Sequence, residues 1–170
     1  MPVTTDIFAT YRAPRKVLRR HLAMGEREDR ALMFLMVACI LILVAQLPRL
    51  SREAALDETA DLAELATGEI FVWLIVMPLF LYGLAAASRL VAKLFGGRGT
   101  WYRARVALFW SLLASTPLWL LRGLVAGFVG PGAALEGVTL LALGIFAILW
   151  FTTLREAERG LDPNGEPHEA

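Results

Sequence analysis

The chain has 170 residues, of which 57% are hydrophobic and only 19% are charged, and its formal net charge is +1. Soluble domains carry about 25% charged residues, so this composition indicates a membrane protein. The near-neutral charge gives no support for nucleic-acid binding, and the length excludes a large multi-domain enzyme. With one cysteine, Cys39, the chain can form neither an intramolecular disulfide nor a cysteine-based zinc site.

Residues 1–30 form a basic cytoplasmic segment in which apolar residues recur at helical spacing. The apolar positions are Ile7, Phe8, Tyr11, Val17, Leu18 and Leu22, and the basic positions between them are Arg12, Arg15, Lys16, Arg19 and Arg20. This pattern predicts an amphipathic interfacial helix, or a broken one that restarts at Pro14, with its apolar face toward the lipid. Its basic residues are the predicted contacts to anionic headgroups. The alternative is a solvated positive flank that only sets the topology.

Four uncharged runs lie between charged residues, at 31–47, 70–88, 106–121 and 137–154. A helix of 16 to 19 residues covers roughly 24 to 29 Å, close to the thickness of a hydrocarbon core. None of the runs carries the polar stripe that a helix of a soluble bundle needs. The sequence therefore predicts an all-α fold, a polytopic integral membrane bundle of about four transmembrane helices within 31–154.

The basic residues are distributed unevenly among the segments that flank these runs. In chain order these segments hold 7, 2, 5, 1 and 2 Lys or Arg residues, counting the polar tail 155–170 as the last. Because cytoplasmic loops are enriched in Lys and Arg, the alternation predicts four spans with both termini in the cytoplasm. Arg outnumbers Lys by 15 to 2. We interpret that bias as typical of a GC-rich bacterial genome, which predicts a bacterial plasma (inner) membrane location.

The segments between the runs predict local structure. The acidic connection 50–69 is expected to form a short surface helix on the outer face. Gly96, Gly97 and Gly99 predict a tight cytoplasmic turn, and the sequence around them lacks the Lys-Ser/Thr of a P-loop. Pro117 predicts a kink in the third span. Two pairs of small residues spaced four apart predict helix-packing faces, namely Gly83 with Ala87 and Gly123 with Gly127.

No set of residues in the sequence suggests catalysis, a metal site or a cofactor. His21 and His168 both lie outside the spans, and neither has a second His or a Cys at metal-ligand spacing. The serines and threonines of the spans have no intramembrane His or Lys that could activate a nucleophile. Two functions remain open: a structural or interaction protein that organises membrane or protein partners, and a small-solute transporter or channel subunit. The first is favoured because the spans offer few polar groups near their middle. Its expected partners are anionic lipids, other membrane proteins or a second copy of the chain.

Three stretches together resemble the Yip1 domain family in its short bacterial form. They are Tyr11-Arg12-Ala13-Pro14-Arg15 before the first span, the turn Gly96-Gly97-Arg98-Gly99-Thr100-Trp101, and Pro117 after Trp110. The resemblance covers about residues 6–155. It implies a helical integral membrane protein without known catalysis. Eukaryotic members usually have five spans and act in vesicle trafficking with small GTPases, whereas this chain has four predicted spans.

Overall fold

The computed structural model describes residues 3–57 and 59–159, and the regular elements in this part of the chain are all helices. They are α1 (Val3–Arg12), α2 (Pro14–Ala23), α3 (Glu28–Leu56), α4 (Leu62–Phe71), the π-helical η1 (Val72–Val76), α5 (Met77–Leu94), α6 (Trp101–Phe128) and α7 (Ala133–Glu158). Four helices among the described residues, counting α4, η1 and α5 as one, are long and apolar enough to cross a membrane. The predicted four-span helical fold is confirmed.

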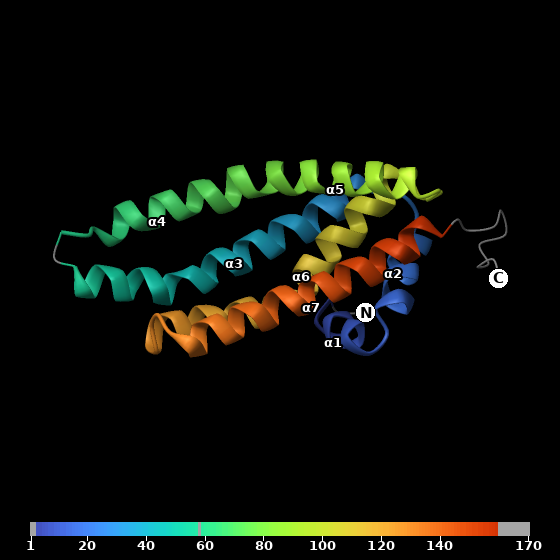
Figure 1. The fold of residues 1–170 in the computed structure, drawn as a ribbon. Helices are drawn as coiled ribbons and strands as arrows, with labels where there is room; N and C mark the ends of the chain where they lie inside the picture. The colour runs from blue at the N-terminus through green and yellow to red at the C-terminus, as the bar shows by residue number, and fades with distance from the viewer. Residues whose placement is uncertain (1–2, 58, 160–170) are drawn as a thin grey trace.

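The helices run lengthwise between two ends (Figure 1). One end holds the turn between α5 and α6, the end of α7 and the start of α3, and we call it the α5–α6 end. The other holds the α3–α4 and α6–α7 turns and is called the α3–α4 end. Of the predicted tail 155–170, the first residues continue α7 as far as Glu158, and residues 160–170 lie outside the described part of the chain.

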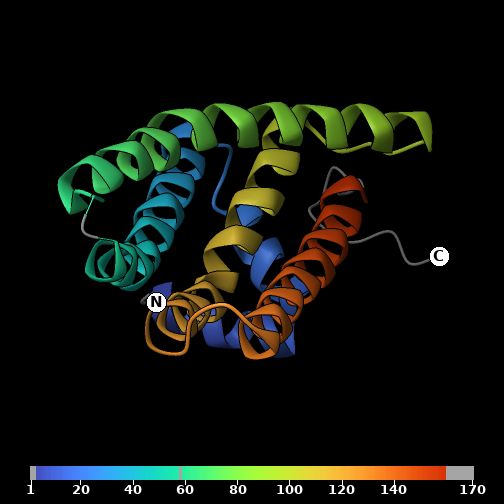
Figure 2. The same ribbon diagram turned by 60° about the vertical axis from the view of Figure 1, so that its left-hand side comes forward.

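Helix α6 occupies the centre of the bundle, between α3 and α7, and α5 crosses one side of it (Figure 2). Of the most apolar 18 residues of α6, 67% are buried, whereas only 11% are buried in the corresponding window of the α4–α5 span. Polar and aromatic contacts join α6 to its neighbours: Ser111 bonds Thr153 of α7 at 2.9 Å, and Tyr82 of α5 packs edge-on against Phe109 at 5.0 Å. The three other spans therefore leave much of their apolar surface open to surrounding lipid.

Helices α3 and α6 approach each other closely through two glycines. A Cβ atom at Gly123 would overlap the backbone carbonyl of Ala45, and one at Gly127 would overlap Pro48. Lipid provides no hydrophobic drive between helices, so the close backbone approach that glycine permits supplies the van der Waals contact instead. In this structure the small pair of α6 faces α3.

The small pair of α5 does not lie at an interface in the described structure. Nothing stands within 4 Å of a Cβ built at Gly83, and Ala87 is exposed. The buried residues of α5 are Leu81 and Ala85. Each lies two residues before a member of the small pair, which places it roughly on the opposite side of the helix. In the single chain the face of Gly83 and Ala87 is therefore open, and the packing role predicted for it stays a prediction.

The acidic connection is shorter than the sequence predicts. Helix α3 continues through Pro48 to Leu56 and α4 begins at Leu62, with Asp61 as its N-cap. The residues of the expected surface helix are therefore the end turns of two long helices. Arg49 of α3 pairs with Glu69 of α4, and Glu69 also accepts a hydrogen bond from Trp73 at 3.0 Å. The π-helical segment η1 ends at Val76, two residues before Pro78, whose missing N–H cannot donate in a regular helical turn.

The glycine contact between α3 and α6 predicts a marked difference between two equivalent substitutions. Gly123→Ala should lower the stability of the detergent-solubilised protein by about 1–3 kcal/mol, because the new methyl group overlaps the Ala45 carbonyl. Gly83→Ala is the matched control, since it places the same methyl group in open space and should be neutral or slightly stabilising. Thermal unfolding followed by circular dichroism measures both. Equal melting temperatures would show that the helices are not in close contact at Gly123.

Candidate functional site

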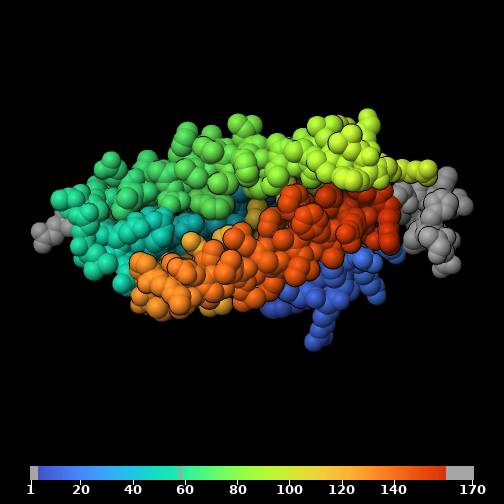
Figure 3. Space-filling view, viewed as in Figure 1, coloured from blue at the N-terminus to red at the C-terminus, as the bar shows by residue number. Residues whose placement is uncertain are grey.

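The N-terminal elbow, formed by α1 and α2, is a broken helix held against the side of the bundle. The break lies at Ala13, whose backbone leaves the helical region (φ −147°, ψ 65°), and α2 restarts at Pro14. Pro disfavours a helical conformation in the residue before it, and its own fixed φ suits a first helical turn. Figure 3 shows the elbow (blue) as a ridge beside α7, toward the α5–α6 end. The sequence motif Ala13-Pro14 thus positions two short helices at an angle.

The apolar residues of α2 pack into the protein. Val17, Leu18 and Leu22 are buried and belong to the same core cluster as Phe34 of α3 and Trp110 of α6. On α1, by contrast, Phe8 is 73% exposed. The predicted amphipathic pattern is therefore present, but most of its apolar side contacts helices instead of lipid, and only α1 presents a large apolar side chain outward.

A buried polar cluster joins the elbow to the bundle. Trp110 donates its indole N–H to the Thr10 hydroxyl at 3.0 Å, and that hydroxyl donates to the Asp6 carbonyl at 2.7 Å. Asp6 is 6% exposed, and its carboxylate accepts a hydrogen bond from Arg20 at 2.8 Å. Tyr11 donates to the Ala114 carbonyl at 2.7 Å. Buried polar groups that are satisfied in this way fix one orientation of the elbow on α6.

His21 lies inside this cluster, a place that metal-ligand spacing in the sequence does not predict. Its ring is 4.2 Å from that of Trp110 and 5.2 Å from that of Phe34, and no hydrogen bond reaches either ring nitrogen among the described residues. The signal was its place beside Val17, Leu18 and Leu22 on one helical stripe, which indicates burial rather than metal binding. Burial lowers the pKa of His21 from its ordinary 6.5 to about 4. Asp6 opposes this shift, and Arg30 and Arg20 add to it.

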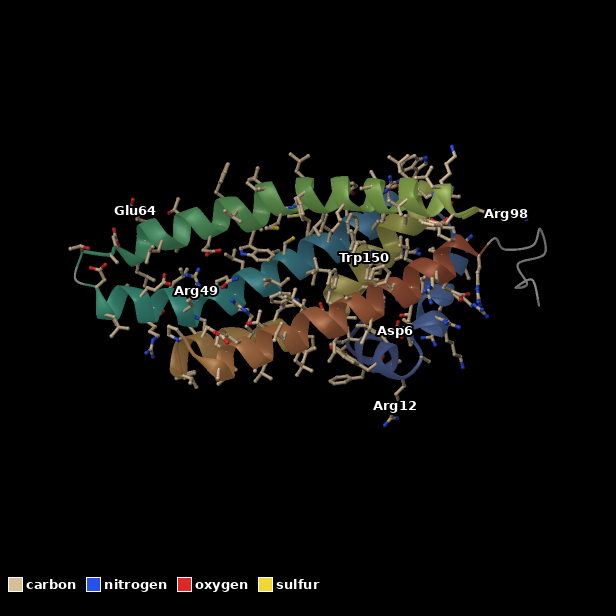
Figure 4. The ribbon with its side chains drawn as sticks, viewed as in Figure 1. Asp6, Arg12, Arg49, Glu64, Arg98 and Trp150 are labelled. Carbon is tan, nitrogen blue, oxygen red and sulfur yellow. The ribbon has the colours of Figure 1, made fainter. Side chains whose placement is uncertain are left out.

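The five predicted membrane-surface residues are all exposed on the elbow, but they fall into two groups. Arg19 pairs with Glu156 of α7, and Arg20 pairs with Asp6, so these two also hold the elbow in place. Within residues 3–57 and 59–159, Arg12, Arg15 and Lys16 make neither ion pairs nor hydrogen bonds through their side chains. Figure 4 shows Arg12 projecting away from the bundle. Three cationic groups are thus available to an external anion.

The glycine turn between α5 and α6 packs against the end of α7. Gly96 has a positive φ of 83°, which favours glycine. A Cβ at Gly99 would stand 2.6 Å from the Ala157 carbonyl oxygen, and the Gly99 N–H donates to the Glu158 carboxylate at 3.0 Å. The same carboxylate pairs with Arg89 at 3.2 Å. The turn therefore needs glycine because its backbone lies directly against α7.

The remaining predicted site residue, Pro117, lies within α6, which continues to Phe128. The Leu113 carbonyl, which Pro117 cannot serve, accepts a hydrogen bond from the Thr116 hydroxyl at 2.8 Å. The predicted kink stays a prediction. In the part of the chain that the structure describes, no group of His, Cys, Asp and Glu is arranged to hold a metal ion.

The buried His21 predicts that the elbow loosens in mild acid. Its neutral form is favoured in the folded state, so this contribution to stability is complete above pH 6.5 and is lost as the pH falls toward about 4. The loss is at most about 1.4 kcal/mol per pH unit for one group. Trp110 fluorescence and melting temperature should therefore change between pH 6.5 and 4 in the native protein. A His21→Leu variant removes the titration and should respond less, and an equal response would contradict this role.

Comparison with known protein families identifies the family of this chain. The model of the Yip1 domain family matches residues 8–164, a range that begins within α1 and contains all four spanning helices. Comparisons with curated proteins and with solved structures give no match. The resemblance seen in the sequence motifs is confirmed by a match that covers nearly the whole chain. This protein belongs to the Yip1 domain family.

Proposed function

We propose that this protein is a non-catalytic organiser of a bacterial inner membrane, and that its N-terminal elbow binds anionic headgroups of the cytoplasmic leaflet. The proposal rests on the presence of two kinds of residue in the elbow, buried apolar residues and exposed basic residues. Val17, Leu18 and Leu22 anchor it to the bundle, while Arg12 and Lys16 project outward without protein partners among the described residues. Each Lys or Arg near an anionic membrane surface contributes about 1 kcal/mol of attraction.

The distribution of charge supports an orientation with both termini in the cytoplasm. Arg12 and Arg98 lie toward the α5–α6 end, and Arg49 and Glu64 lie toward the other end (Figure 4). At the α3–α4 end the cation Arg49 is paired with acids, Glu53 at 2.7 Å and Glu69. An excess of unpaired cations at one end is typical of the cytoplasmic side. The exposed basic residues and the acidic connection thus favour opposite sides of the membrane.

The alternative function, a small-solute transporter or channel subunit, has less support from the polar side chains of α6. Ser111 donates to the Ala107 carbonyl, Ser115 to the Leu112 carbonyl and Thr116 to the Leu113 carbonyl, at 2.7 to 2.8 Å. Hydroxyl groups that bond their own helix backbone are poor ligands for a passing solute. We therefore keep the organising role, with lipids as the first partner and with other membrane proteins or a second copy as further predicted partners.

A quenching experiment tests the proposed lipid contact. The protein is reconstituted with brominated phosphatidylglycerol or brominated phosphatidylcholine, and the quenching of tryptophan fluorescence reports which lipid gathers around it. We expect the anionic lipid to exceed its bulk share, and the preference to decrease as salt screens exposed charges over about 10 Å at 0.1 M. The Arg12→Gln/Lys16→Gln double variant should lose most of this preference.

The matched control is Lys93→Gln/Arg98→Gln, which removes two exposed cations at the same end without touching the elbow. Arg98 lies at the far tip of the α5–α6 end (Figure 4), so this variant should keep the preference. Equal losses of the lipid preference in the two double variants would show that the elbow acts only through its share of the overall positive charge. The absence of any anionic preference in the native protein would refute the proposed contact.

A labelling experiment tests the orientation. Single cysteines replace Thr59, in the short α3–α4 connection, and Met24, after α2; both positions are exposed, and the native Cys39 is buried. In intact bacterial cells, a membrane-impermeant maleimide should label Thr59→Cys. It should reach Met24→Cys only after the cells are opened. The reverse pattern would invert the topology, and labelling of both in intact cells would show that α3 does not cross the membrane.

A further inference from the structure

A groove of about 810 Å³ lies where the elbow meets α6, and we call it the elbow groove. Its lining includes Phe8, Tyr11, Arg12 and Lys16 of the elbow and Pro117 and Leu118 of α6. The Tyr11 ring is held in place by its hydrogen bond to the Ala114 carbonyl, so this wall is fixed. The groove opens on the outside of the bundle, away from the core between the spans.

The lining of the elbow groove combines two kinds of surface. Phe8 is 73% exposed, Pro117 is exposed and Leu118 is half-buried, so one part is apolar and open. Arg12 and Lys16 supply two cations at its edge that have no partner among the described residues. A second hollow of about 560 Å³ shares these two residues and adds Arg15 and Arg19. An apolar trough that leads to a cationic edge suits an amphiphile with a negative head.

The position of the groove fits a lipid. The elbow lies beside the bundle toward the α5–α6 end, and the Arg12 side chain projects outward from it (Figures 3 and 4). Pro117 and Leu118 lie within the apolar run of α6, so the groove leads from the basic elbow to hydrocarbon depth. Acyl chains are the apolar groups present at that depth, and phosphate is the anion present at the adjacent interface.

We propose that the elbow groove binds one anionic glycerophospholipid of the cytoplasmic leaflet. Its phosphate contacts Arg12 and Lys16, and one acyl chain lies against Phe8, Pro117 and Leu118. This inference rests on the proposed function, and it replaces a diffuse attraction to the leaflet with a discrete site. The elbow and α6 then hold the lipid jointly, which ties the N-terminal segment to the central helix.

The test counts lipids retained by the full chain. Native and variant proteins purified in mild detergent are incubated with equal concentrations of phosphatidylglycerol and phosphatidylcholine, and bound lipid is counted by native mass spectrometry. We expect one phosphatidylglycerol to remain on each native chain and phosphatidylcholine to bind at least about five times more weakly, as expected for the loss of one basic contact near the membrane surface. Glycerol phosphate, which has the charge without the chains, should not displace the lipid.

Two matched pairs of variants separate the groove from charge alone. Leu118→Trp fills the apolar part without changing a charge and should abolish retention, whereas Leu140→Trp, at an exposed leucine of α7, should keep it. Lys16→Gln, at the groove edge, should weaken binding about fivefold. Arg15→Gln removes an equal charge outside the groove and should change binding little. The Lys16 pair alters only exposed side chains, so it decides the matter even if Leu118→Trp does not fold.

Four outcomes would overturn the site. Retention of lipid by a folded Leu118→Trp protein, or equal weakening by Lys16→Gln and Arg15→Gln, would show that charge alone acts; the broader proposal of an anionic preference would then survive. Displacement by glycerol phosphate would indicate a soluble phosphate ligand in place of a lipid. Equal binding of both lipids to the native chain would refute the site and the broader proposal together.

Discussion

The structure depends on α6 as the common partner of the other helices. Within a bilayer, apolar surface gains nothing by moving from lipid to protein, so helices associate where shape and polar groups fit. In α6 this fit comes from Gly123 and Gly127 against α3, and from Ser111 against Thr153 of α7. Trp110 of the same helix anchors the elbow through Thr10. Helices that touch α6 are fixed in position, and their remaining faces stay open to lipid.

The elbow combines packing contacts to the bundle with exposed basic residues. An isolated amphipathic helix would bind the membrane through its apolar face. Here Val17, Leu18 and Leu22 pack against the bundle, so the protein itself, not the lipid, sets the height and direction of the basic residues. Arg19 and Arg20 are committed to Glu156 and Asp6. The cations that remain are few, pre-positioned and adjacent to an apolar groove, which favours a defined ligand over diffuse attraction.

The sequence predicts the number of spans well because charged side chains are expelled from hydrocarbon and separate the apolar runs. It is less informative about which face of a span meets another helix. The same four-residue spacing of small residues occurs at Gly83 and at Gly123, yet only Gly123 lies against a neighbouring backbone. Sequence patterns also do not predict the polar cluster, because Asp6, His21 and Trp110 are far apart in the chain. Residue spacing identifies one helix's faces, whereas partners are set by three-dimensional packing.

In the proposed role, the protein itself holds the elbow, and lipid is its ligand instead of its support. Backbone hydrogen exchange in nanodiscs of phosphatidylcholine alone tests this most directly. The account predicts that the amides of Val17, Leu18 and Leu22 exchange slowly there, to an extent comparable with the buried part of α3, because stable packing suppresses local opening. Fast exchange that becomes slow only when anionic lipid is added would contradict it, and would show that the membrane surface folds and positions the elbow.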